Sequence, residues 1–169
     1  MIDGIDVKTV SLKRLRDSIA MVPQDPFLFT GTIRFNLDPH NRYSDTQIWS
    51  ALEIVQMKSV ISKHSNKLEL DIKNNGSELS VGQRQAICLA RALLKGCRII
   101  VMDEATSNLD NETEALIRGS WLSGVSQETT IISIAHRLET IMDYDVVLVM
   151  SQGRIIEHGN PRKLARTRG

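Results

Sequence analysis

The sequence predicts an α/β fold with parallel strand pairing. Short, continuous apolar runs at residues 19–22, 99–102 and 129–135 have the length and composition of buried strands. Segments with a helical period separate these runs, and an order of strand, helix and strand favours parallel pairing. The 169 residues suffice for one domain or a compact pair of lobes, and a hydrophobic content of 41% excludes a disordered chain.

The first half of the sequence contains one predicted strand and one predicted amphipathic helix. Residues 19–22 form the strand, and Pro23 ends its hydrogen bonding. Residues 46–60 place apolar side chains at a helical period, with Ser44 or Asp45 as the N-cap. The region around this helix shows no strand pattern, so we expect it to be wholly helical and to form a separate lobe.

A second helix begins after a polar, asparagine-rich loop. Ser80 and Gln83 have the spacing of a capping box, and Gly96 is placed to end the helix. A helix N-terminus presents unpaired N–H groups and the positive end of the helix dipole, so it attracts phosphate. Gly82 lets a ligand approach the backbone closely. The alternative is an ordinary capped helix, because the pattern S-x-x-Q is a frequent cap.

The last part of the chain alternates strands and helices. The continuous apolar run 99–102 is typical of a strand covered on both faces. Residues 111–121 have a helical pattern, and residues 146–150 and 154–157 flank the turn Ser151-Gln152-Gly153 as a hairpin. This alternation predicts the sheet of an α/β domain.

Two acids, Asp103 and Glu104, directly follow the strand at 99–102. Ligands of open α/β sheets bind at the carboxyl ends of the strands. An aspartate there can hold Mg²⁺ beside nucleotide phosphates, usually through water, and a following glutamate can polarise an attacking water. The alternative is a strand that simply ends in a polar loop.

Two further polar side chains lie at predicted strand ends. Gln24 follows Pro23, and its amide oxygen suits a metal ion or an attacking water. His136 follows the strand at 129–135, where an imidazole can donate a hydrogen bond to a phosphate oxygen. Taken alone, each residue is more simply explained as a turn or structural residue.

The order of these motifs resembles the ATP-binding cassette (ABC) ATPase domain over nearly the whole chain. The resemblance implies a P-loop NTPase-like parallel sheet with an inserted helical subdomain, and it implies ATP and Mg²⁺ as ligands. Gln24 is then the glutamine of the Q-loop, and Leu79-Ser80-Val81-Gly82-Gln83 is the signature motif, with Val81 where a glycine is commoner. The implied nucleotide-binding residues are Gln24, Ser80, Val81, Gly82, Gln83, Asp103 and Asp110.

The same resemblance assigns the catalytic roles. Asp103 ends the Walker B strand and holds Mg²⁺ together with Gln24, and Glu104 is the catalytic base. His136 is the switch histidine that contacts the γ-phosphate. The segment that ends at Asp110 is the D-loop.

Three segments narrow the resemblance to the second nucleotide-binding domain of multidrug-resistance-associated proteins, the C subfamily of ABC transporters. These segments are residues 22–29, 31–39 and 79–85. The resemblance implies a second nucleotide-binding domain as partner in a head-to-tail ATP sandwich, and transmembrane domains that bring the chain to the cytoplasmic face of a membrane. A net charge of +1 gives no support for a nucleic-acid partner.

The sequence contains no G-x-x-x-x-G-K-[ST] segment, the phosphate-binding loop of this family. The resemblance therefore implies that the chain starts partway into the domain, with the strand at 99–102 left with an unpaired edge and an uncovered face. On this view residues 1–30 are a remnant of the core, residues 31–95 the helical subdomain, and residues 96–169 the rest of the core. The alternative function is a non-hydrolysing fragment that only donates its signature motif to a partner's ATP site.

Overall fold

The α/β fold is present in the computed structural model, which describes residues 1–125, 128–135 and 137–166. The chain divides into two compact units, residues 1–133 and residues 134–169, and each is described by itself. The division into three parts expected from the sequence stays a prediction. Within the described ranges, no helix is both long and apolar enough to span a bilayer.

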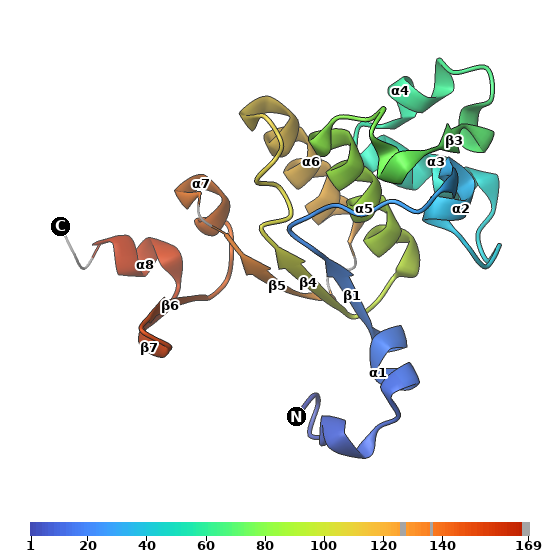
Figure 1. The fold of residues 1–169 in the computed structure, drawn as a ribbon. Helices are drawn as coiled ribbons and strands as arrows, with labels where there is room; N and C mark the ends of the chain where they lie inside the picture. The colour runs from blue at the N-terminus through green and yellow to red at the C-terminus, as the bar shows by residue number, and fades with distance from the viewer. Residues whose placement is uncertain (126–127, 136, 167–169) are drawn as a thin grey trace. The chain divides into compact units, whose positions relative to one another are not determined.

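The larger unit is built on a three-stranded sheet in which β4 is the central strand (Figure 1). Its strands, in spatial order, are β1 (Ile19–Val22), β4 (Ile99–Asp103) and β5 (Thr130–Ile134). β1 runs parallel to β4, with Val22 opposite Met102. All three predicted strands are confirmed. The expected unpaired edge of β4 is wrong, because β1 and β5 flank it on both sides.

One face of this sheet is covered and the other is open. Ala20 and Val22 of β1 are buried, whereas Met21 between them is 65% exposed. In β5, Ile131 packs against the core and Ile132 is 55% exposed. The expectation that β4 is covered on both faces is therefore wrong in this structure, and the uncovered face expected from the resemblance is present.

The second predicted helix is α5 (Val81–Lys95), and its sequence signals act as expected. Ser80 Oγ accepts from the Gln83 N–H at 3.1 Å, and Gln83 Oε1 accepts from the Ser80 N–H at 3.0 Å. Gly96 ends the helix in the left-handed conformation, with φ of 60°. This φ favours glycine, because a side chain there would strain the backbone.

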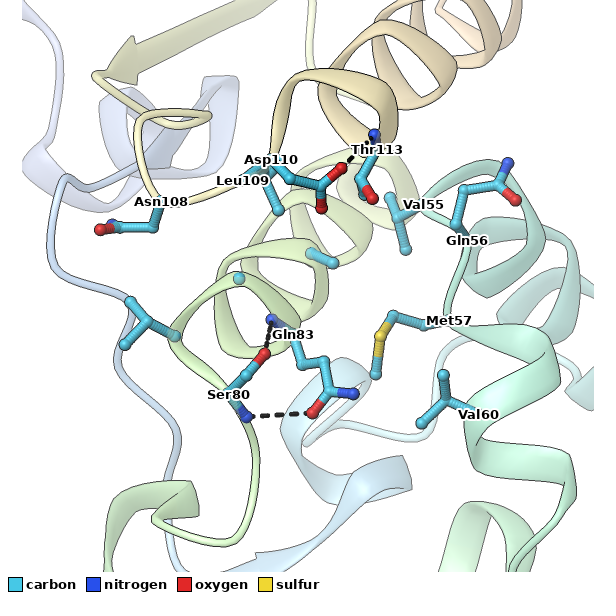
Figure 2. A pocket seen from close by; sticks show the side chains of 13 residues that line it. Val55, Gln56, Met57, Val60, Ser80, Gln83, Asn108, Leu109, Asp110 and Thr113 are labelled. Carbon is cyan, nitrogen blue, oxygen red and sulfur yellow. Dashed lines mark hydrogen bonds between the residues drawn. The ribbon is translucent and has the colours of Figure 1, made fainter.

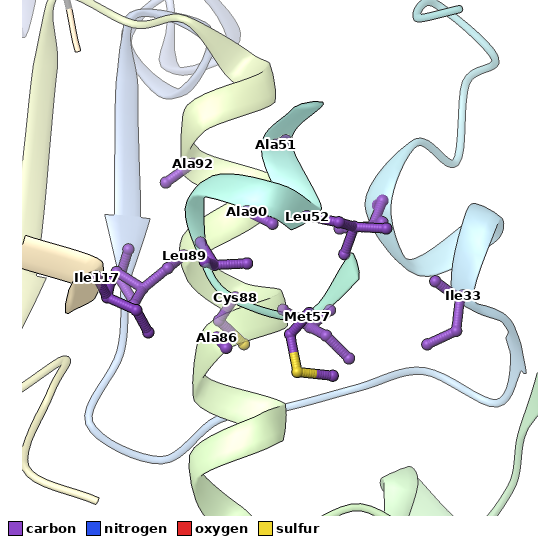
Figure 3. Packing of buried hydrophobic residues seen from close by; sticks show 14 of the residues in the cluster. Ile33, Ala51, Leu52, Met57, Ala86, Cys88, Leu89, Ala90, Ala92 and Ile117 are labelled. Atoms are coloured by element: carbon purple, nitrogen blue, oxygen red, sulfur yellow. The ribbon is translucent and has the colours of Figure 1, made fainter. Parts of the chain in front are cut away.

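The hydrophobic core surrounds α5 (Figure 3). Ala51 and Leu52 of α3 pack on one side of the helix, and Ile117 of α6 lies on another. Within α5, Ile87 and Ala90 are fully buried. Full burial of a large aliphatic side chain stabilises a fold by about 1.5–3 kcal/mol. The middle of α5, where the buried residues lie, is therefore held firmly in place.

The region between β1 and α5 is mainly helical. It contains α2 (Ile33–Leu37), α3 (Asp45–Ile54), α4 (Lys58–Ser62), the 3₁₀ helices η2 (Lys67–Glu69) and η3 (Asn74–Gly76), and the strands β2 (Gly31–Thr32) and β3 (Asp71–Ile72). Because β2 and β3 pair antiparallel, the expectation of a wholly helical region is wrong. The helix predicted at 46–60 is divided into α3 and α4, since Gln56 has φ of 60° and turns the chain between them. Ser44 is the N-cap of α3.

Three further helices belong to the larger unit. They are η1 (Val7–Thr9), α1 (Leu12–Ser18) and α6 (Asn111–Gly124). The helix pattern at 111–121 is confirmed as α6. The sequence analysis did not predict α1, although Ser11 caps it by accepting from the Arg14 N–H. The available signal was a serine directly before an apolar residue, Leu12.

The smaller unit contains α7 (Leu138–Ile141), β6 (Val147–Ser151), β7 (Arg154–Gly159) and α8 (Pro161–Arg166). β6 and β7 pair antiparallel, which confirms the predicted hairpin. Its two turn residues, Gln152 and Gly153, have φ of 48° and 73°. Positive φ at both central positions gives the twist that joins two antiparallel strands tightly.

Candidate functional site

Gln24 and Glu104 lie next to each other beyond the carboxyl ends of two strands. Gln24 Nε2 donates a hydrogen bond to Glu104 Oε2 at 3.2 Å. The parallel register explains the contact, because Val22 pairs with Met102 and both residues lie two positions further along their strands. The sheet therefore brings together two side chains that the sequence analysis selected separately.

The chain turns sharply at Glu104. This residue has φ of 47°, a left-handed conformation that is uncommon for a side chain without a short polar group. Asp103, one residue earlier, ends β4 and is half-buried, as is Glu104. Strained backbone of this kind persists where the surrounding structure determines it, and it concentrates at functional sites.

The oxygen donors here fit a magnesium ion bound beside phosphates. Asp103 offers a carboxylate, and Gln24 uses its nitrogen toward Glu104, which leaves its amide oxygen for a cation. Mg²⁺ prefers oxygen ligands and takes only one or two protein groups at nucleotide sites, with water and phosphate completing its shell. In the part of the chain that the structure describes, no three His, Cys, Asp or Glu side chains gather as a metal site. Asp103 and Gln24 thus match the one or two protein ligands that such a magnesium ion takes.

The N-terminus of α5 is the second element of the site. Ser80 uses its oxygen as an acceptor for the Gln83 N–H, so its hydroxyl hydrogen remains for donation to an anion. Val81 follows with its side chain 43% exposed. This position accommodates a valine because it projects toward solvent.

Gly82 lies where the chain packs tightly against itself. A Cβ atom on Gly82 would lie 3.1 Å from the backbone oxygen of Asn108 and 3.2 Å from Leu109 Cδ2. Both neighbours belong to the segment identified as the D-loop. The absence of a side chain at Gly82 therefore lets the D-loop lie against the start of α5, in addition to any approach by a ligand.

Asp110 ends the D-loop and begins α6. Its Oδ1 accepts from the Thr113 N–H at 2.9 Å, which makes it the N-cap of that helix. Hydrogen bonds from Thr113 lower the pKa of the Asp110 carboxyl below its usual value. The bond from the Thr113 backbone has the largest effect, and a bond from its side chain has the next largest. The carboxylate is therefore held in its charged form at the same surface as Ser80.

A pocket of about 440 Å³ lies between the start of α5, the D-loop and the turn that joins α3 to α4 (Figure 2). The capping pair Ser80 and Gln83 lines one side, and Met57 and Val60 line another. The dashed lines in Figure 2 mark the capping bonds of Ser80 and the bond from Thr113 to Asp110. The sequence analysis did not predict the contribution of the α3–α4 turn.

Glu114 is a buried acid that the sequence analysis missed. Its Oε1 accepts from Thr106 Oγ1 at 2.9 Å, and the residue is only 6% exposed. Glu114 shares the buried face of α6 with Ile117 and Trp121. An acid at a position where the helical period calls for an apolar side chain was the available signal. The bond anchors the chain between Glu104 and the D-loop.

The remaining predicted site residue, His136, lies outside the described residues. Its role as the switch histidine stays a prediction from the resemblance. Every other predicted site residue belongs to the larger unit, just after β1, at or just after the end of β4, at the start of α5 or at the start of α6.

The sequence of the chain is similar to members of the ABC transporter family. The model of the ABC transporter family matches residues 1–107. The chain is 46% identical over 169 residues to ATP-binding cassette sub-family C member 2 of Rattus norvegicus, covering 100% of this chain and 11% of that protein. It is 45% identical over 168 residues to ABC transporter C family member 2 of Dictyostelium discoideum, covering 99% and 12%. A probable multidrug resistance-associated protein of Drosophila melanogaster, lethal(2)03659, is 46% identical over 164 residues, covering 97% and 12%.

A solved structure agrees with these relatives. A bacterial Atm1-family ABC exporter with ATP bound superposes with a TM-score of 0.92 at 36% identity, covering 100% of this chain and 30% of that chain. The chain spans about a tenth of the length of the curated relatives it matches, at 11–12%.

Proposed function

The chain belongs to the ABC transporter family, and on this basis we propose that it supplies the ATP-hydrolysing machinery of an exporter that couples hydrolysis to transport across a membrane. The observation that carries this proposal is the hydrogen bond between Gln24 and Glu104. It joins the residue identified as the Q-loop glutamine to the residue identified as the catalytic base.

Glu104 acts as the general base toward the attacking water. Its carboxylate is fixed by Gln24 and by the turn at the end of β4, so it is held in one place before substrate arrives. Positioned acid–base groups of this kind contribute about 10²–10⁴-fold to rate. In phosphoryl transfer, positioning and charge stabilisation supply most of the remaining acceleration.

Asp103 and Gln24 would hold a magnesium ion through their side-chain oxygens, Asp103 by way of water. When bound, Mg²⁺ neutralises charge that develops on the phosphate oxygens. The roles of the two neighbouring acids would then differ, because Asp103 would help to hold the cation while the Glu104 carboxylate would accept a proton from the attacking water. His136 would donate to the γ-phosphate.

Ser80 acts on a nucleotide held by a second nucleotide-binding domain. Its oxygen already caps α5, so the hydroxyl donates outward to the γ-phosphate while the positive end of the helix dipole supports the same charge. Gln83 keeps the serine in place through the reciprocal bond. In this arrangement two domains share ATP head to tail, and transmembrane domains couple the cycle to export at the cytoplasmic face of the membrane.

The experiment that tests this function separates the two sites of the ATP sandwich. The chain is joined to an upstream phosphate-binding loop, paired with a second nucleotide-binding domain that has lost its own catalytic base, and assayed for ATP turnover. Turnover that persists shows that the site of this chain hydrolyses ATP. Loss of all turnover contradicts the proposal and favours the alternative, a fragment that only donates its signature motif.

A further inference from the structure

Two side chains of α5 hold the segment of chain on either side of Gln24. Gln85, which is completely buried, donates from Nε2 to the carbonyl oxygen of Pro23 at 3.0 Å. Arg91 donates from Nη1 to the carbonyl oxygen of Phe27 at 2.6 Å. The flanks of the Q-loop are therefore tied to the same helix that carries the signature motif at its start.

Arg91 makes the larger set of these contacts. Its Nε donates to the carbonyl oxygen of Asn36 at 2.5 Å, and its Nη2 donates to Asn36 Oδ1 at 2.6 Å. The guanidinium carbon also lies 5.7 Å from the centre of the Phe29 ring. The guanidinium group thus makes three hydrogen bonds, one to Phe27 and two to Asn36, and one cation–π contact with Phe29.

Asn36 extends this contact along the loop. The residue is 2% exposed, and its Oδ1 accepts from the Phe29 N–H at 2.8 Å as well as from Arg91. Its Nδ2 donates to the carbonyl oxygens of Phe29 and Thr32 at 2.8 and 3.0 Å. A buried network in which each polar group is paired is rigid, and removing one member leaves the others unsatisfied.

We propose that Arg91 is a positioning residue for ATP hydrolysis, which fixes the loop after Gln24 to α5 and so keeps the Gln24 amide against Glu104. The inference rests on the proposed function, because it needs Gln24 and Glu104 to act in hydrolysis. Arg91 itself contacts neither residue among the contacts described, and it acts through the carbonyl of Phe27 and through Asn36.

The geometry of the guanidinium group makes this role specific. Arginine presents donors in a fixed planar fork, whereas lysine has one compact charged group on a flexible stem. Lysine at this position keeps the charge but cannot reach Phe27 and both oxygens of Asn36 together. Arg91→Lys therefore tests the positioning of the loop without removing the positive charge.

The test measures kcat and KM for ATP in the complete transporter, in the wild type and in Arg91→Lys. We expect kcat to fall about tenfold or more and KM to change less than about threefold, since nucleotide contacts lie elsewhere. In a Gln24→Ala background, Arg91→Lys should cause no further loss, because both changes remove the same interaction. Additive losses, or a wild-type kcat in Arg91→Lys, would overturn the proposal.

Two controls separate positioning from stability and from the proposed function. Leu52→Val shortens a fully buried side chain of α3 that does not belong to this network, and at a matched melting temperature it should keep kcat within about twofold. An equal loss of kcat in Leu52→Val would overturn the proposal. Amide exchange at Phe29, whose N–H is held by Asn36, should accelerate in Arg91→Lys. If the wild-type transporter does not hydrolyse ATP, the proposed function fails. The exchange experiment is independent of hydrolysis: an unchanged exchange rate at Phe29 in Arg91→Lys would overturn the positioning role of Arg91.

Discussion

Gln24 and Glu104 are hydrogen-bonded at 3.2 Å although 80 positions separate them in the sequence. The parallel register of β1 and β4 accounts for this contact. Val22 pairs with Met102, and Gln24 and Glu104 each lie two positions further along their own strand's direction. The bond fixes the end of the Glu104 side chain at the carboxyl edge of the sheet, where nucleotide chemistry takes place in α/β proteins.

Glu104→Gln should abolish turnover while leaving ATP binding intact. The substitution keeps an acceptor oxygen for Gln24 but removes the base, so the loss belongs to the proton-transfer step. We expect kcat in the complete transporter to fall by at least about 10²-fold and the Kd for ATP to change less than about threefold. Unchanged hydrolysis would remove Glu104 from the role of base.

The sequence alone predicted local features well, because their causes lie within a few residues. The cap at Ser80, the end of α5 at Gly96 and the acids that follow β4 each depend on neighbours in the chain. The contact between Gln24 and Glu104 depends on how β1 pairs with β4, and no local pattern specifies that pairing. The resemblance assigned these residues their roles, and the structure supplied the distance between them.

Two features could not be predicted for physical reasons. β2 and β3 have two residues each, which is too short for a periodic pattern. The break between α3 and α4 lies at Gln56, a residue type that carries no turn signal. The open face of the sheet was expected from the resemblance alone, because the continuous apolar composition of β4 indicates cover on both faces.

Ser80→Ala should affect both stability and the partner's site. Loss of an N-cap serine costs about 1 kcal/mol of unfolding free energy. Ser44 offers a matched control, because it forms the same capping box with Gln47 at the start of α3. We expect both alanine variants to lose similar stability in thermal unfolding, while only Ser80→Ala slows hydrolysis at the site of the partner domain. Equal effects on hydrolysis would mean that the serine acts only as a cap.

Gly82→Ala should displace the D-loop. The new Cβ would meet the backbone oxygen of Asn108 at 3.1 Å, and a backbone atom cannot rotate away as a side chain does. Overpacking of this kind costs about 1–3 kcal/mol, which exceeds the smaller gain in helix propensity. Gly119 in α6 is the control, since nothing lies within 4 Å of its Cβ position. Gly119→Ala should raise the free energy of unfolding by about 0.5–1 kcal/mol, and a similar gain in Gly82→Ala would contradict the packing argument.

The open sheet face predicts opposite results for two neighbouring residues of β1. Met21 is 65% exposed and Val22 is completely buried. Met21→Thr should change the free energy of unfolding by less than about 0.5 kcal/mol and reduce aggregation and dye binding by the isolated chain, because it removes exposed apolar surface. Val22→Ala should cost about 2 kcal/mol. A large loss in Met21→Thr would show that this face is covered in solution.

The carboxyl group of Asp38 allows a prediction of how the stability of the chain depends on pH. Burial raises the pKa of its carboxyl, but backbone N–H donors of Arg42, Tyr43 and His40 outweigh this and leave the pKa below its usual value. The Tyr43 N–H, for example, lies 2.8 Å from Asp38 Oδ2. A carboxyl whose pKa is lower in the folded state contributes stability that is complete above its unfolded pKa of about 3.9 and is lost as the pH falls through the folded value.

Asp38→Asn tests this dependence, because the amide carries no charge to titrate. We expect the variant to lose roughly 1–3 kcal/mol of unfolding free energy at pH 7. The difference from the wild type should shrink as the pH falls below about 4, when the wild-type carboxyl takes up its proton. Asp71→Asn, which changes an exposed side chain of β3, serves as the control and should stay within about 0.5 kcal/mol of the wild type at pH 7. Thermal unfolding of the chain between pH 2.5 and 7 measures both variants. A difference between Asp38→Asn and the wild type that stays constant with pH would show that packing, and not the charge of Asp38, stabilises this loop.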